Sequence, residues 1–156
     1  MKLYDWVYTF YNVCIFKKGP QDVPYSTYAL QFLTGSIFII FCALTNYKLA
    51  LLNVIIRFVF VRLLLLAYKK PARYVQVMTT FWGVDLTFLF IQLSINSVLL
   101  NLGITAPDIL LYIEIIWVFA IYTYLIKNSI NINSSVSFLY VLLLFSIFNV
   151  ILRGLI

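Results

Sequence analysis

Five long apolar segments dominate this sequence and restrict what it can fold into. They cover residues 28–45, 49–68, 75–100, 108–126 and 136–152. A helix needs about 20 apolar residues to cross about 30 Å of hydrocarbon, at about 1.5 Å per residue. Strands are not expected, because the runs are continuous rather than alternating and too few for a closed barrel. The sequence therefore predicts an all-α polytopic membrane bundle of five transmembrane helices.

The composition indicates a lipid bilayer rather than water as the solvent. Of the 156 residues, 64% are hydrophobic and only 10% are charged, whereas a soluble domain averages about 25% charged residues. The mean hydropathy is +1.02. A net charge of +6 would suit a nucleic-acid partner, but no cationic face with interleaved exposed aromatics remains once the spans are placed. We therefore expect an integral membrane protein that binds no nucleic acid.

The basic residues predict the orientation of the bundle, because cytoplasmic loops are enriched in Lys and Arg. With the N-terminus inside, seven basic residues fall on the cytoplasmic side and two, Lys48 and Arg153, on the other. The seven are Lys2, Lys17, Lys18, Lys69, Lys70, Arg73 and Lys127. We expect a cytoplasmic N-terminus and a C-terminus on the far side, with Lys69, Lys70 and Arg73 at the membrane surface.

Residues 1–18 predict an amphipathic helix that is too short to span the bilayer. Its polar residues recur every three or four positions, on one helical face: Lys2, Asp5, Thr9 and Asn12. We expect this helix to lie in the interface, where Trp6, Lys17 and Lys18 contact the bilayer and its anionic lipid head groups. Packing beneath the bundle is the alternative. Residues 19–27 then form a linker, and residues 28–152 form the five-helix bundle.

Two arginines, Arg57 and Arg62, lie inside the second apolar segment. Its Leu, Ile, Val and Phe side chains favour insertion by about 6 kcal/mol in total. Two central arginines cost about as much, so the span has little preference of its own for the bilayer. Carboxylates on neighbouring helices are therefore expected to compensate the two charges.

Asp85 and Glu114 are the only acids well inside the apolar segments, on the third and fourth spans. Counting about 1.5 Å per residue from the centre of each span places Arg62 at the height of Asp85 and Arg57 at the height of Glu114. The two arginines lie about 140° apart around their helix, so they can face different neighbours. We therefore predict two buried ion pairs, Arg62–Asp85 and Arg57–Glu114.

Three amides extend this polar character into a seam. Gln92 and Asn96 share a helical face with Asp85, and Asn53 shares one with Arg57. Such side chains usually hydrogen-bond between helices. Because the charges balance two against two, the seam is interpreted first as a structural lock on the bundle. A transport or ion path, and the docking of a partner, are the alternatives.

Sequence motifs for catalysis are missing. There is no histidine, which removes the usual haem, zinc and proton-relay ligand. Cys14 and Cys42 fit neither a metal-ligand spacing nor a CxxC motif. No GxSxG, HExxH or glycine-rich phosphate loop occurs, and Asp85 and Glu114 lie too far apart in depth to act as a catalytic pair. We expect no cofactor, no metal and no enzymatic activity.

Two segments, KKPARYVQVMTTFWG (69–83) and WVFAIYTYLIKNSININSS (117–135), resemble the third and fourth spans of the Yip family. That resemblance implies five spans, a cytoplasmic N-terminus and a non-catalytic role in membrane organisation or trafficking. Only Gly19-Pro20 matches the DLYGP motif of eukaryotic members, and their long N-terminal region, which is linked to small-GTPase and coat partners, is lacking. The chain is therefore more similar to bacterial members, which implies a bacterial inner (plasma) membrane.

We therefore expect a non-enzymatic scaffold or accessory protein that binds a protein partner or a second copy of itself. A small transporter or channel subunit that uses Arg57, Arg62, Asp85 and Glu114 is the first alternative. An accessory subunit of a membrane enzyme complex is the second.

Overall fold

A computed structural model describes residues 3–103 and 108–155. Within these residues the chain forms six α-helices, two short 3-10 helices and no strand. Five of the helices are long and apolar enough to cross a membrane. The prediction of an all-α bundle with five long helices and a shorter N-terminal helix is confirmed. The five apolar helices are consistent with an integral membrane protein.

The helices follow one another with short connections. The N-terminal helix α1 covers Leu3–Cys14, and the 3-10 helix η1 covers Pro20–Asp22. The long helices are α2 (Thr27–Leu44), α3 (Tyr47–Ala67), α4 (Tyr74–Asn101), α5 (Asp108–Ile130) and α6 (Ser134–Leu155). The 3-10 helix η2 (Pro71–Arg73) joins α3 to α4.

Side-chain caps explain where several of the helices begin. Ser26 Oγ accepts a hydrogen bond from the amide of Ala29 at 3.2 Å, at the start of α2. Asn46 and Asn133 do the same at the starts of α3 and α6, each at 2.9 Å from an amide three residues on. Such caps satisfy amides that have no partner within the helix. The polar residues between the apolar segments therefore act as helix starts as well as connectors.

Helix α5 continues further than the apolar pattern predicts, to Ile130 rather than residue 126. The side chain of Asn128 donates to the carbonyl of Tyr124 at 2.9 Å, and Ser129 Oγ donates to Leu125 at 2.6 Å. These polar side chains thus bond back to their own helix instead of starting a turn. The gap between the fourth and fifth apolar segments, residues 127–135, predicts a connector, and this prediction is wrong in its first part, because Ser129 and Ile130 belong to α5 and are buried in the bundle.

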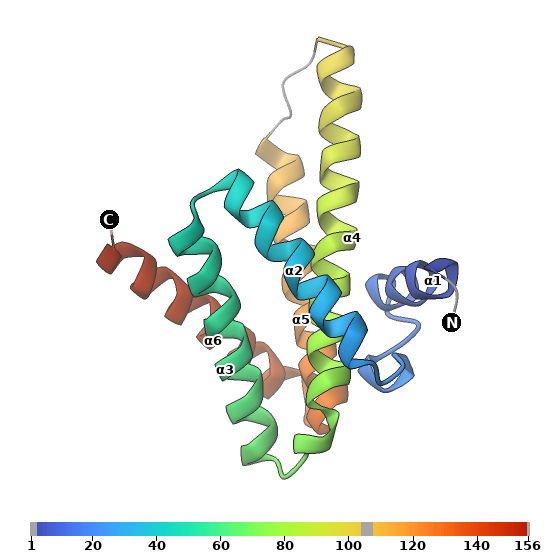
Figure 1. Ribbon diagram of the computed structural model, residues 1–156, viewed down its shortest axis with the longest axis vertical. Helices are drawn as coiled ribbons and strands as arrows, with labels where there is room; N and C mark the ends of the chain where they lie inside the picture. The colour runs from blue at the N-terminus through green and yellow to red at the C-terminus, as the bar shows by residue number, and fades with distance from the viewer. Residues whose placement is uncertain (1–2, 104–107, 156) are drawn as a thin grey trace.

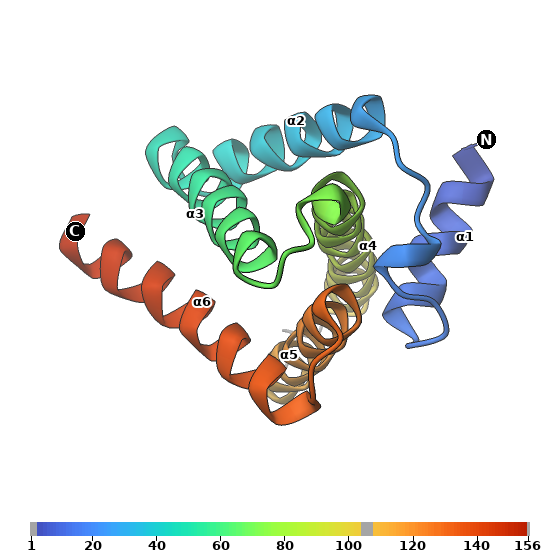
Figure 2. The same cartoon turned by 90° about the horizontal axis from the view of Figure 1, so that it is seen from below.

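The helices are arranged around α4, which packs against α1, α2, α3 and α5. Figure 2 shows α4 near the middle, with the α2–α3 hairpin on one side and the α5–α6 hairpin on another. Helix α6 packs against α3 and α5 and then runs outward to the C-terminus (Figure 1). Lys69, Lys70 and Arg73, in the α3–α4 connection, and Lys127, near the end of α5, lie at the same end of the bundle, which we call the basic end.

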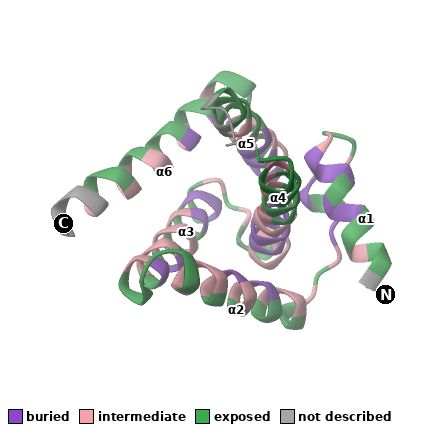
Figure 3. Cartoon of the chain, turned by 90° about the horizontal axis from the view of Figure 1, so that it is seen from above, coloured by how far each residue is buried: buried purple, intermediate pink, exposed green. Residues whose placement is uncertain are grey.

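Burial is concentrated in the part of the bundle nearer the basic end. Every residue of α4 from Val77 to Val84 is buried. Further along, α4 and α5 project beyond the α2–α3 turn (Figure 1), and most of their side chains there are exposed (Figure 3). We call residues 90–101 of α4 and 109–117 of α5 the α4–α5 extension. Its exposed side chains are mostly large and apolar, which suits contact with lipid or with another protein.

Helix α1 lies across α4, beside it rather than beneath the bundle (Figure 1). Phe10, Val13 and Cys14 are buried in the contact. The ring of Phe10 lies so close to Gly83 that a Cβ added at Gly83 would overlap it. A residue without a side chain is therefore what lets α1 approach the backbone of α4.

The polar stripe of α1 does not all face outward, as an interfacial helix would require. Thr9 and Asn12 are buried, and Asn12 satisfies its amide by donating to the carbonyl of Tyr8 at 2.6 Å. The exposed face instead carries Tyr4, Val7, Tyr8 and Tyr11. Packing against α4 decides the orientation of this helix, since the buried side includes Phe10. Its placement at a membrane surface stays a prediction, now based on an aromatic face.

Cys14, at the end of α1 and outside the five long helices, should react slowly with thiol reagents. Burial, with a smaller contribution from the nearby Asp85 carboxylate, raises the pKa of the Cys14 thiol to about 12. The thiolate is the reactive form, so at pH 8 its population is far below that of an ordinary thiol. In the Cys42→Ala protein, we expect N-ethylmaleimide to label Cys14 about a thousandfold more slowly than after denaturation, in proportion to the thiolate population. Mass spectrometry measures both rates, and equal rates would contradict this placement of Cys14.

Candidate functional site: a buried arginine, aspartate and tyrosine

The most polar contact inside the bundle joins three helices. Arg57 of α3 donates through Nη1 to Oδ2 of Asp85 on α4, which forms an ion pair. The same Nη1 donates to the hydroxyl of Tyr122 on α5 at 2.7 Å. The Tyr122 hydroxyl in turn donates to Oδ1 of Asp85. These contacts close a ring, and we call the three residues the triad.

The triad is enclosed by aromatic rings. The guanidinium carbon of Arg57 lies 5.2 Å from the ring centre of Trp82 and 5.6 Å from that of Tyr122. Phe81 packs edge-on against Tyr122 at 4.8 Å between ring centres. Only 15% of the Arg57 side chain and 12% of the Asp85 side chain are exposed. Ionic contacts are stronger away from water, and removing one partner there is correspondingly costly.

The predicted pairing of these charges was wrong, although Arg57 and Asp85 do meet. Arg57 precedes the end of α3 at Ala67 by ten residues, and Asp85 follows the start of α4 at Tyr74 by eleven. Both therefore lie about 15–17 Å along their helices from the short α3–α4 connection. That connection sets the register of the two helices. Depths counted from the centre of each span give a different register, because α4 is seven residues longer than α3 (28 against 21) and the two centres therefore lie at different distances from the connection.

Arg62, predicted to pair with Asp85, is exposed instead. It lies five residues before the end of α3, about 8 Å from the basic end. Its guanidinium carbon sits 5.3 Å from the ring centre of Tyr74. A long side chain this close to the end of a span can extend its charge toward the interface, so it needs no carboxylate partner.

Glu114, predicted to pair with Arg57, lies half-buried on the α4–α5 extension. Gln92 and Asn96 are also half-buried there, on the face of α4 that carries Asp85. Across the described ranges, no hydrogen bond or ion pair connects the side chains of these three residues to the rest of the chain. The predicted polar seam is therefore a set of aligned residues, not a continuous hydrogen-bonded network.

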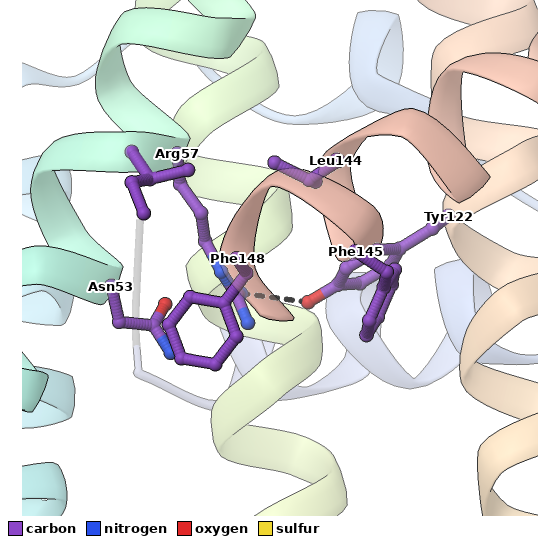
Figure 4. Close-up of a pocket in the computed structure, with 7 residues that line it drawn as sticks. Asn53, Arg57, Tyr122, Leu144, Phe145 and Phe148 are labelled. Atoms are coloured by element: carbon purple, nitrogen blue, oxygen red, sulfur yellow. Dashed lines mark hydrogen bonds between the residues drawn. The ribbon is translucent and has the colours of Figure 1, made fainter. Parts of the chain in front are cut away.

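A small cavity borders the triad on the side of α6. Its volume is about 80 Å³. Arg57, Tyr122 and Asn53 form its polar wall, and Ile56 with three α6 residues, Leu144, Phe145 and Phe148, forms its apolar wall. Figure 4 shows these side chains converging from α3, α5 and α6. Asn53 Oδ1 is buried and receives no hydrogen bond from the described residues.

Tyr122 is the member of the triad that the sequence interpretation missed. It is one of twelve tyrosines in the chain, and its residue type alone does not set it apart from the others. A usable signal existed, because Tyr122 lies eight residues before the end of α5. This distance, about 12 Å, is close to the heights of Arg57 and Asp85 above the basic end. A tyrosine at that depth lies away from the interface, and its hydroxyl needs a partner within the bundle.

The residues predicted to lie at the membrane surface occupy two places. Trp6 is half-buried on α1 against Phe10, with 5.6 Å between ring centres. Lys17 is exposed after α1, and Lys18 places its ammonium 5.5 Å from the ring centre of Tyr8. At the basic end Lys69 is exposed, Lys70 is half-buried, and Arg73 donates to the carbonyls of Asn128 and Ser129 at 3.3 Å. Arg73 thus also ties the start of α4 to the end of α5.

The triad holds charge and fixes the orientation of its three side chains. Its charges neutralise each other, and both oxygens of Asp85 are already hydrogen-bonded. In the part of the chain that the structure describes, no three residues of His, Cys, Asp and Glu cluster closely enough to hold a metal ion. The chain matches no protein-family model, no curated protein and no solved structure. The resemblance to the Yip family therefore remains a prediction from two segments.

Proposed function

We propose that this protein is a non-enzymatic scaffold or accessory protein of a membrane, and that it binds a partner through the α4–α5 extension. The observation that carries the proposal is the placement of Gln92, Asn96 and Glu114. They are half-buried among exposed apolar side chains, and none has a hydrogen-bond partner among residues 3–103 and 108–155. In hydrocarbon, polar groups without partners are unfavourable. A partner helix that bonds to them would remove this penalty.

The spacing of the amides suits a helical partner. Gln92 and Asn96 are four residues apart on one face of α4, so they present two hydrogen-bonding groups about one helical turn apart. Polar side chains of this kind hold membrane helices together, at about 0.6 kcal/mol for each contact. The partner is thus a membrane helix with polar side chains, from another protein or a second copy. A subunit of a membrane enzyme complex is one such partner.

The triad supports this role by fixing the frame that carries the extension. It joins α3, α4 and α5 through one closed set of contacts. Because all three residues are bonded to each other, the triad is better suited to hold helices than to pass an ion. The gap in hydrogen bonding between Asp85 and Gln92 also weighs against a transport path.

The proposed setting is the inner (plasma) membrane of a bacterium, with the basic end toward the cytoplasm. The clustering of Lys69, Lys70, Arg73 and Lys127 at that end supports this orientation. The exposed aromatic face of α1, with Lys17 and Lys18 beside it, supports contact of α1 with anionic head groups.

To test the proposal, the three polar side chains without partners are replaced together, as Gln92→Leu, Asn96→Leu and Glu114→Leu. Three lost contacts amount to about 2 kcal/mol, so association should weaken about tenfold to thirtyfold. Light scattering of the detergent-purified complex gives its protein mass, which should exceed the 18.2 kDa of one chain for the wild type. The triple variant should return to the mass of one chain.

The matched control, Ser94→Leu with Thr123→Val, also removes polar groups from α4 and α5. Both hydroxyls already donate to their own helix, Ser94 to Phe90 at 2.7 Å and Thr123 to Phe119 at 2.8 Å. This control should associate as the wild type does. If the wild type has the mass of a single chain in native membranes as well as in detergent, the proposal is wrong.

A further inference from the structure

The side of the Arg57 guanidinium that faces the cavity has unused hydrogen-bonding capacity. Its Nη1 makes both contacts with Asp85 and Tyr122. Among the described residues, no hydrogen bond is formed by Nε or Nη2, which together carry three N–H groups. Asn53 Oδ1 is a second polar atom of this wall without a partner there. Polar groups without partners at the wall of a cavity are the groups to which an occupant can hydrogen-bond.

We propose that the cavity binds the carbonyl end of an uncharged, lipid-soluble molecule. The carbonyl oxygen accepts hydrogen bonds from the free edge of Arg57 and from Nδ2 of Asn53, once the Asn53 side-chain amide is turned so that Nδ2, rather than the unpartnered Oδ1, faces the cavity. The body of the molecule lies against the apolar wall formed by Phe145 and Phe148. This inference is independent of the partner surface on the α4–α5 extension.

The occupant should carry no charge, because the triad beside the cavity already has no net charge. Arg57 and Asp85 already neutralise each other as an ion pair. A carboxylate or phosphate in the cavity would add a charge without compensation, in surroundings where ions are poorly solvated. A ketone, quinone or ester oxygen accepts hydrogen bonds from Arg57 without adding charge.

The volume of the cavity and the residues that line it limit how much of the ligand can enter the cavity. A cavity of about 80 Å³ exceeds the roughly 10–15 Å³ that one water requires, but it is too small for a whole lipid. Water needs two to four polar partners, which only the Arg57, Tyr122 and Asn53 side of the cavity can supply, whereas the wall of Ile56, Leu144, Phe145 and Phe148 suits an apolar body. Ile56, Phe145 and Phe148 are only half-buried, so the cavity reaches the surface of the chain. The polar end therefore enters from the lipid phase and the remainder stays outside.

Trp82 provides a reporter, because its ring centre lies 5.2 Å from the guanidinium carbon of Arg57. With Trp6→Phe and Trp117→Phe it is the remaining tryptophan, since the chain has three. The protein is placed in nanodiscs of ether-linked phospholipids, which lack carbonyl groups. A benzoquinone with a decyl tail is then titrated as the carbonyl probe and fluorescence quencher. We expect saturable quenching of Trp82.

Leu144→Phe fills the cavity and should weaken binding of the probe about tenfold or more. Leu143→Phe adds the same ring at an exposed position of α6 and should leave binding unchanged. Ile56→Phe and its exposed neighbour Ile55→Phe form a second matched pair, used if Leu144→Phe does not fold.

Discs of ester-linked phospholipid distinguish the two sources of a carbonyl. Weaker apparent binding of the probe there identifies the ester groups of the bilayer as the occupant, whereas unchanged binding identifies a separate carbonyl compound. Linear quenching without saturation, equal in the wild type and in both phenylalanine variants, would show that only water enters and would overturn the proposal.

Discussion

The Asp85→Ala variant should lose most of its folded population in detergent. It leaves the Arg57 guanidinium buried without a counter-charge, with 15% of its side chain exposed. Removing one partner of a buried ion pair typically costs about 3–5 kcal/mol, a large fraction of the stability of a small protein. Thermal unfolding, followed by light scattering and tryptophan fluorescence, measures the loss. Tyr122→Phe should cost less, about 1–3 kcal/mol, because it removes one donor from Asp85 and keeps the ion pair.

Three further variants separate the loss of pairing from general damage to the bundle. Glu114→Ala and Arg62→Leu each remove a charge from a helix and should change the unfolding temperature little, since neither residue has an ion-pair partner in the described ranges. The double variant Arg57→Leu with Asp85→Leu should recover much of the stability lost in Asp85→Ala, because no charge is then left unpaired. An Asp85→Ala protein as stable as the wild type would show that the triad does not hold the bundle.

The long helices were predictable because their signal is local. Length and apolar content identify a span without reference to the other spans. The starts of α2, α3 and α6 were within reach for the same reason, since Ser26, Asn46 and Asn133 cap amides three residues away. The end of α5 was less accessible, because Asn128 and Ser129 suit either a turn or a helix that buries them. Tertiary packing decided between the two.

The partners of the buried charges depend on how helices are placed against each other, and composition does not report this. Of the four charges predicted to form buried ion pairs, Arg57 and Asp85 form one with each other, whereas Arg62 and Glu114 form none within the described part of the chain. A register counted from the α3–α4 connection would have selected Arg57 and Asp85. Tyr122 would still have required knowledge of the side on which α5 packs. The third member of the triad is thus a property of the assembled bundle.

Gly83→Ala should detach α1 from the bundle, although the same change usually favours a helix. Alanine in place of glycine within a helix gains about 0.5–1 kcal/mol. Here the new Cβ would overlap the ring of Phe10, which is buried and packs against the ring of Trp6. Overpacking of this kind costs about 1–3 kcal/mol, so the steric loss exceeds the gain in helix propensity. Labelling of Cys14 by maleimide measures the result, because Cys14 lies at the end of α1 and becomes accessible when α1 leaves.

Gly35→Ala provides the matched control, since a Cβ added there meets no atom within 4 Å. It makes the same chemical change in α2 and should stabilise slightly or have no effect, with Cys14 still protected. Adding Phe10→Leu to Gly83→Ala relieves the overlap by replacing the ring with a smaller and more flexible side chain, and should restore part of the protection. A Gly83→Ala protein whose Cys14 reacts as slowly as in the wild type would mean that α1 does not rest on this glycine.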